Sequence, residues 1–94
     1  MNKYESVIII NPNLESEGIK SLNEKISNLI NSNGKVNSIE EIGKKKLAYE
    51  IKKNKEGYYV VIKFEANPSL ISELERVYGI TDEIIKFIDV KEEE

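Results

Sequence analysis

The chain has 94 residues, of which 33% are charged and 39% hydrophobic, and its formal net charge is −3. This length suits one domain with its own core and is too short for two. Cysteine and histidine are absent, which excludes disulfides, zinc–thiolate sites and catalysis that relies on a thiolate or an imidazole. No apolar run is long enough to cross a membrane, so we expect a cytoplasmic protein.

The first third of the chain predicts a strand followed by a helix. Residues 3–10 are rich in β-branched side chains and end at Asn11-Pro12-Asn13, a turn signal, which is typical of a buried strand. We expect Asn13 to cap the helix and Gly34 to end it, because glycine accepts the left-handed conformation common after a helix. The apolar residues of this helix recur on one face, namely Ile19, Leu22, Ile26, Leu29 and Ile30.

The middle of the chain predicts a β-hairpin. Its first strand begins at Val36, and Gly43 is expected to mark a bulge or kink. Beyond Gly43 the alternation places Leu47, Tyr49 and Ile51 on one face and Lys46, Ala48, Glu50 and Lys52 on the other. A polar connection over residues 53–57 leads to a second alternating strand, one face of which carries Tyr58, Val60, Ile62 and Phe64.

The last third predicts a helix and a final strand. Asn67 is expected to cap the helix, and Pro68 suits its first turn because no backbone donor is needed there. The apolar face consists of Leu70, Ile71, Leu74 and Val77, and Gly79 is expected to end the helix. Residues 84–90 predict the last strand, and the acidic residues 92–94 are expected to form a frayed tail.

The order strand, helix, strand, strand, helix, strand predicts an α+β fold. Two right-handed crossovers place both helices on one face of a four-stranded antiparallel sheet and leave the other face open. This βαββαβ arrangement is the ferredoxin-like fold. We expect it to form a single domain over residues 1–91.

The charged residues do not predict a catalytic or metal site. Adjacent acids such as Glu40 and Glu41 point to opposite faces of a strand, so they cannot easily share a metal ion. Arg76 is expected to face solvent on the second helix, whereas acylphosphatases, small enzymes of the same fold, need an arginine in the loop after the first strand. We therefore expect no enzymatic activity, no metal and no cofactor.

The tyrosines give a weaker indication of function. Tyr58 and Tyr59 occupy the place in the third strand where an RNA-recognition motif carries its stacking aromatics. Residues 56–62 depart from that motif at several positions, and we expect one of the two tyrosines in the core and the other facing outward. Tyr49 belongs to the core by alternation, yet it is close enough to the neighbouring lysines to line a basic surface.

Lysines are concentrated in the hairpin. Six lysines and one acid lie between Lys44 and Lys55, a local charge of +5 that leaves −8 on the rest of the chain. One interpretation is a solvated hairpin whose lysines protect an edge strand from aggregation. The other is a phosphate-binding surface, because ammonium groups on an exposed strand follow a sugar–phosphate backbone without reading its bases. Charge alone leaves both interpretations open.

Residues 43–52, Gly-Lys-Lys-Lys-Leu-Ala-Tyr-Glu-Ile-Lys, resemble the signature of the bacterial small-subunit ribosomal protein S6 family at every position. Further similarity covers Lys-Tyr-Glu at 3–5, Asn-Pro at 11–12, Glu-Gly-Tyr at 56–58 and Glu-Leu at 73–74. The resemblance implies the same ferredoxin-like fold and a structural role. The family binds the central domain of small-subunit ribosomal RNA as a heterodimer with the small basic ribosomal protein S-eighteen.

The resemblance also implies which residues face RNA. The signature lysines fall on the RNA side, Lys86 lies in the last strand at a usually basic position, and Lys3 precedes the tyrosine near the N-terminus. Together with the charge pattern, this predicts RNA-binding residues Lys3, Lys44, Lys45, Lys46, Tyr49, Lys52, Lys53 and Lys86. Lysine stands where relatives often carry arginine, which makes bidentate phosphate or guanine contacts weaker candidates.

The net charge of −3 is consistent with a protein that binds RNA together with a protein partner. A few lysine contacts give poor affinity for RNA alone, and a basic partner supplies the remainder. The acidic part of the chain can steer that partner into place. The alternative function is a ferredoxin-like regulatory domain that binds a small ligand at a homodimer interface, for which the loops offer few glycines.

Overall fold

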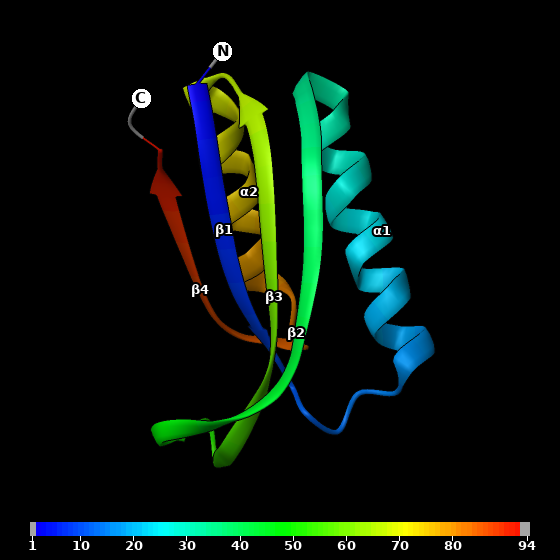
Figure 1. Cartoon of the computed structure of the whole chain (residues 1–94), viewed down its shortest axis with the longest axis vertical. Helices are drawn as coiled ribbons and strands as arrows, with labels where there is room; N and C mark the ends of the chain where they lie inside the picture. The colour runs from blue at the N-terminus through cyan, green and yellow to red at the C-terminus, as the bar shows by residue number, and fades with distance from the viewer. Residues whose placement is uncertain (1, 93–94) are drawn as a thin grey trace.

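A computed structural model describes residues 2–92 of the chain and shows two helices packed on one face of a four-stranded sheet (Figure 1). The sheet order is β2-β3-β1-β4, and each neighbouring pair is antiparallel. The ferredoxin-like βαββαβ fold is therefore confirmed. The elements are β1 (Asn2–Ile10), α1 (Ser16–Asn33), β2 (Gly34–Ile51), β3 (Asn54–Ala66), α2 (Pro68–Ile80) and β4 (Ile84–Lys91).

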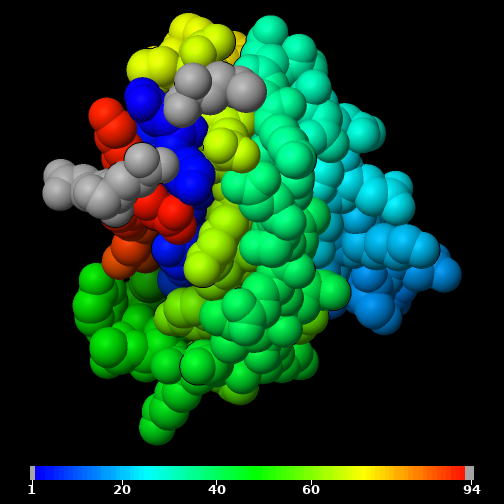
Figure 2. All heavy atoms as spheres, turned by 45° about the horizontal axis from the view of Figure 1, so that its top comes forward, coloured from blue at the N-terminus to red at the C-terminus, as the bar shows by residue number. Residues whose placement is uncertain are grey.

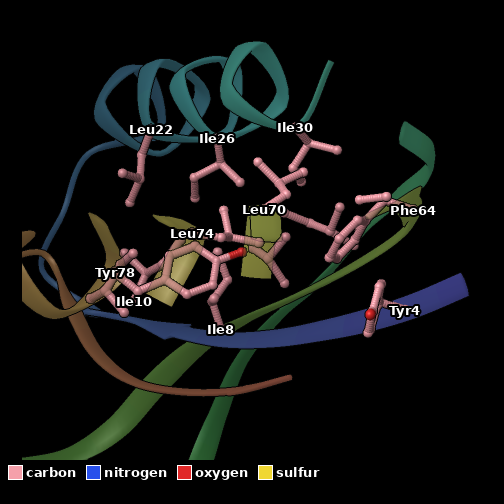
Figure 3. Packing of buried hydrophobic residues seen from close by; sticks show 14 of the residues in the cluster. Tyr4, Ile8, Ile10, Leu22, Ile26, Ile30, Phe64, Leu70, Leu74 and Tyr78 are labelled. Atoms are coloured by element: carbon pink, nitrogen blue, oxygen red, sulfur yellow. The ribbon is translucent and has the colours of Figure 1, made fainter. Parts of the chain in front are cut away.

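The main core lies between the helices and the sheet (Figure 3). Its fully buried side chains include Ile8 on β1, Phe64 on β3 and Leu74 on α2. Burying one such side chain stabilises a fold by about 1.5–3 kcal/mol, so this cluster supplies most of the driving force. The helical faces contribute Ile19, Leu22, Ile26, Ile30, Leu70 and Leu74 as expected, with Leu29 and Ile71 packed at the edge. Tyr78 is also buried here although the sequence did not predict it, whereas the predicted Val77 is only half-buried.

The start of α1 differs from the expectation. The helix is preceded by Glu15, not by Asn13, and no side chain caps it. Instead, the Asn13 backbone N–H donates to Oδ1 of Asn11 at 2.9 Å, and the Leu14 N–H donates to the Asn11 carbonyl at 3.1 Å. Asn11 thus forms a turn of its own, and because of this local hydrogen bonding the helix begins later than expected, at Ser16.

The end of α1 was placed correctly, but the role given to Gly34 was wrong. Gly34 has an extended backbone with φ −171°, not a left-handed one. A Cβ at this position would lie 2.3 Å from the carbonyl oxygen of Glu65 on β3. Glycine is required here because β2 starts so close to the end of β3.

Helix α2 extends further than expected at its C-terminal end. Asn67 and Pro68 open the helix as predicted, although the Asn67 side chain makes no capping bond. The helix passes through Gly79 and ends at Ile80, where the Thr81 hydroxyl donates to the Val77 carbonyl at 2.6 Å. Among residues 2–92, no helix is long and apolar enough to cross a membrane.

The chain stays hydrogen-bonded to β1 one residue beyond β4, so the expectation of a frayed tail over residues 92–94 is wrong for Glu92. The backbone N–H of Glu92 donates to the carbonyl of Lys3 at 2.9 Å. The other two residues of the tail predicted to fray lie outside the described residues. The single domain over residues 1–91 stays a prediction.

A buried polar network crosses the core beside β4. The Tyr78 hydroxyl donates to Oγ of Ser6 at 3.2 Å, and the Ser6 hydroxyl donates to Asp89. Burial raises the pKa of Asp89 to about 6, against the effect of the Ser6 hydrogen bond and with the help of the nearby Glu75 carboxyl. Between about pH 4 and pH 6 the folded protein therefore holds a proton at Asp89 that the unfolded chain has already released.

This network predicts a specific pH dependence of stability. The ordinary pKa of Asp89 is 3.8, so its folded-state pKa lies above its unfolded one. Its contribution to the free energy of unfolding is therefore fully present below about pH 4 and is lost as the pH rises through about 6. Replacing Asp89 by Asn, which keeps an acceptor for Ser6, should flatten that decrease in urea unfolding curves. Replacing the exposed Asp82 by Asn is the control, and equal slopes in the two variants would contradict this assignment.

Candidate nucleic-acid interface

The β2–β3 hairpin extends beyond the core and bends at its far end (Figure 1). The pairing register shifts between Glu41 and Gly43. Gly43 has φ +100°, and a Cβ there would meet nothing within 4 Å. Glycine is thus needed for its backbone conformation rather than for space. The predicted bulge at Gly43 is confirmed.

A second apolar cluster holds the bent end of the hairpin against the other face of the sheet. Ile9 of β1, Leu47 of β2 and Ile85 of β4 are all buried in it, with Ile51 and Tyr59 packed at its edge. A Cβ on Gly57 would lie 2.2 Å from Cγ2 of Ile9, which shows how closely the β3 backbone approaches β1. The face expected to be open is therefore covered at this end.

The three consecutive signature lysines are exposed but do not share one face. Lys44 pairs with Tyr58, Lys45 with Gly57 and Lys46 with Glu56. Because side chains alternate along a strand, Lys45 projects from the face opposite to Lys44 and Lys46. The lysines thus surround the strand and do not form a flat patch.

The tip of the hairpin is a two-residue turn made of Lys52 and Lys53. Both are exposed, and their φ angles are +48° and +66°. The amide Nδ2 of Asn54 donates to the Lys52 carbonyl at 3.2 Å. The predicted polar connection over residues 53–57 was too long, because β3 already begins at Asn54. Two lysines therefore occupy positions where hairpins favour Asn-Gly.

Tyr49 is not in the core, contrary to the alternation of the strand. Its side chain is 67% exposed, because it lies in the irregular stretch between the paired residues Lys46 and Ile51. Nζ of Lys86 lies 5.8 Å from the centre of the Tyr49 ring. Such a cation–π contact contributes about 0.5–1 kcal/mol at an exposed site. It brings Lys86 of β4 next to the hairpin, and the hairpin and β4 adjoin in Figure 2.

Lys3 lies apart from the other predicted RNA-binding residues. It is exposed on β1 and pairs with Glu65, whereas the hairpin packs at Ile9 near the other end of the strand. Six residues of strand separate the two positions by roughly 20 Å. The structure therefore gathers the hairpin lysines, Tyr49 and Lys86 but not Lys3.

Tyr58 and Tyr59 are both half-buried. Tyr58 packs against the main core and Tyr59 against the second cluster. Tyr59 lies on the outer face, as expected for one of the pair, but its contacts with the hairpin cluster leave it partly covered. Stacking of bases on an exposed pair of aromatics is therefore not supported by this geometry.

The described residues contain no cluster of metal ligands. No group of three or more acidic side chains within residues 2–92 is placed to hold a metal ion. Arg76 is exposed on α2, as expected, and its Nη2 lies 2.5 Å from Oε1 of Glu73. This hydrogen bond lowers the pKa of Glu73.

The comparisons with known proteins identify the family. The sequence model described as "Ribosomal protein S6" matches residues 3–91. The chain belongs to the ribosomal protein S6 family. This is a family of ribosomal proteins and not of enzymes, which confirms both the resemblance read from the signature and the prediction that the protein is not an enzyme.

Relatives from several bacteria resemble the chain over its whole length. The chain is 53% identical to a small ribosomal subunit protein bS6 of Clostridium perfringens over 95 residues, covering 100% of both chains. It is 50% identical to the protein of the same name from Acholeplasma laidlawii, again over 100% of both. The crystal structure of the 30S ribosomal protein S6 from Thermotoga maritima superposes with a TM-score of 0.91 at 39% identity, covering 97% of this chain and 87% of that one.

The turn at the tip predicts a gain in stability when its lysines are replaced. Each non-glycine residue in a left-handed conformation costs about 1 kcal/mol, and Asn-Gly adopts this turn without that cost. Lys52→Asn with Lys53→Gly should therefore raise the free energy of unfolding by about 2 kcal/mol in urea. The same pair of changes at Lys44 and Lys45 removes equal charge within a strand and should lower stability. A gain in both variants would show that relief of charge repulsion, and not backbone strain, is responsible.

Proposed function

We propose that the protein is a structural component of the small ribosomal subunit that binds the central domain of small-subunit ribosomal RNA. The ribosomal assignment is supported by the family and by relatives named small ribosomal subunit proteins. In a bacterium this would place the protein on the ribosome in the cytoplasm. The single observation that carries the RNA assignment is the lysine-bearing hairpin held in a defined position on the sheet.

The hairpin suits a phosphate backbone better than bases. Its lysines are exposed on both faces of one strand and at the turn, with Lys86 alongside through Tyr49. Ammonium groups spread around a projecting strand can contact several phosphates from within a groove or junction of folded RNA. Tyr49 is exposed enough to stack on a base or ribose next to these contacts.

We also propose that a basic protein, ribosomal protein S-eighteen, binds as a heterodimer partner. Outside the segment from Lys44 to Lys55 the chain carries −8, which would repel RNA unless a cationic partner covers part of it. The pair would present a continuous positive surface. The small-ligand alternative is less well supported, because the chain belongs to a ribosomal family.

Replacing Lys44, Lys45 and Lys46 together by Ala tests the RNA surface. Affinity for the central-domain RNA, measured with the basic partner present, should decrease, and its salt slope should fall by about one unit for each lost phosphate contact. The fold should persist because all three side chains are exposed.

A matched control separates local contacts from overall charge. Lys25, Lys35 and Lys91 are also exposed, and their replacement by Ala removes the same charge away from the bent end of the hairpin, since Lys35 lies at the start of β2. Equal losses of affinity in the two triple variants would contradict the assignment of RNA binding to the hairpin. If neither variant lost RNA affinity, the hairpin lysines would serve only to keep an exposed edge strand solvated.

A further inference from the structure

A groove of about 700 Å³ lies between α1 and β2, on the helix-bearing side of the sheet. β2 is an edge strand, with β3 as its neighbour in the sheet. The groove ends next to the lysine hairpin, because Tyr58 in its lining pairs directly with Lys44. Side chains that give the groove its chemical character are Lys20, Asn23, Glu24, Ile39, Glu41 and Tyr58.

Asn23 is a polar residue at a core position of α1. It shares the buried face of the helix with Ile19, Leu22 and Ile26, and its side chain is only 8% exposed. Its Oδ1 accepts no hydrogen bond from any described residue. A buried amide without a partner opposes folding, whereas leucine at this position would favour it. A hydrogen-bond donor entering the groove would remove that penalty.

The rim of the groove is rich in acceptors. Glu24 and Glu41 line it with one ammonium group, that of Lys20. The Tyr58 hydroxyl donates to Oε1 of Glu41 at 3.2 Å and thereby orients the carboxylate. The Tyr58 hydroxyl is a donor at neutral pH, and burial, followed by the charge of Glu41, raises its pKa further above the ordinary value of 10.0. Ile39, 39% exposed, adds an apolar surface.

We propose that this groove receives an arginine side chain of a basic protein partner. The guanidinium would donate to the Glu41 carboxylate and to the amide oxygen of Asn23, while its aliphatic stem would lie against Ile39. A guanidinium has donors only, in a planar fork, and it loses less hydration energy than an ammonium when it enters such a site. RNA is a poor occupant, because its phosphates would meet two carboxylates. The inference rests on the proposed function and places the partner directly beside the RNA-binding lysines.

The test uses a pair of small probes on the full-length protein. N-acetyl-arginine amide carries a guanidinium, and N-acetyl-citrulline amide is its uncharged isostere. In ¹⁵N NMR titrations the arginine probe should give saturable shifts at the Asn23 side-chain amide and at the backbone amides of Glu41 and Tyr58. The citrulline probe should bind at least about tenfold more weakly, as expected for loss of a charge-assisted hydrogen bond. Absence of saturable shifts at these positions would overturn the proposal.

Two neighbouring glutamates provide a matched pair of variants. Glu41 lines the groove, whereas Glu40 pairs with Val61 and projects from the other face of the strand. Glu41→Gln should weaken binding of the arginine probe about tenfold, and Glu40→Gln should leave it within about twofold, although each removes one negative charge. Equal effects would mean that general electrostatic attraction is responsible, which would overturn the proposal.

Asn23→Leu distinguishes a binding residue from a structural one. We expect a higher melting temperature together with loss of arginine binding. A lower melting temperature with binding retained would show that Asn23 serves the fold alone, and the proposal would fail.

RNA affinity of the isolated protein should be unchanged in Glu41→Gln. Failure of the groove proposal and failure of RNA binding at the hairpin would therefore be seen in separate measurements.

Discussion

The packing of Leu47 against Ile9 and Ile85 fixes the far end of the β2–β3 hairpin on the sheet. Without it, the lysines beyond Gly43 would sit on a two-stranded ribbon with no support, and isolated ribbons have marginal stability in water. The cluster is small compared with the main core, yet it determines the direction in which six of the fourteen basic residues of the chain project. The Lys86–Tyr49 contact adds a second tie between β4 and the hairpin.

Several residues with proposed binding roles lower the stability of the fold. Lys52 and Lys53 occupy left-handed positions that Asn-Gly would fill at lower cost, and Asn23 places an unpaired amide in a helix face made for apolar residues. Each departs from what local propensity or core packing favours, and each lies next to a proposed contact with RNA or protein. Local conformational preference and core packing usually favour the same residue as the overall fold, and they disagree where a surface has a function other than folding. The acidic remainder of the chain would act in the same way, because its charge disfavours RNA and would favour the proposed basic partner.

The sequence predicted the fold more fully than the site. Hydrophobic periodicity identified both helical faces and the β3 alternation, since these residues depend only on which side meets the core. It failed for Tyr49 because the strand leaves its regular register there, and no local pattern encodes a partner strand's register. The second cluster was missed for the same reason, since Leu47 reaches Ile9 and Ile85 only through the bend at Gly43. The unusual position of Asn23 could have been found from the sequence, because Asn23 is an amide within an otherwise apolar face of the helix.

The most direct test of the central claim is the RNA affinity of Leu47→Ala, which removes no charge. Hydrogen exchange should show faster opening of the hairpin amides, with the amides of β1 and α2 still protected by the main core. Affinity for the central-domain RNA, with the basic partner present, should fall by about tenfold or more, since a mobile hairpin must be ordered at the moment of binding. Leu47→Met, which preserves volume, should keep nearly full affinity. A loosened hairpin with unchanged RNA affinity would contradict the account, because the position of the lysines would then be irrelevant to binding.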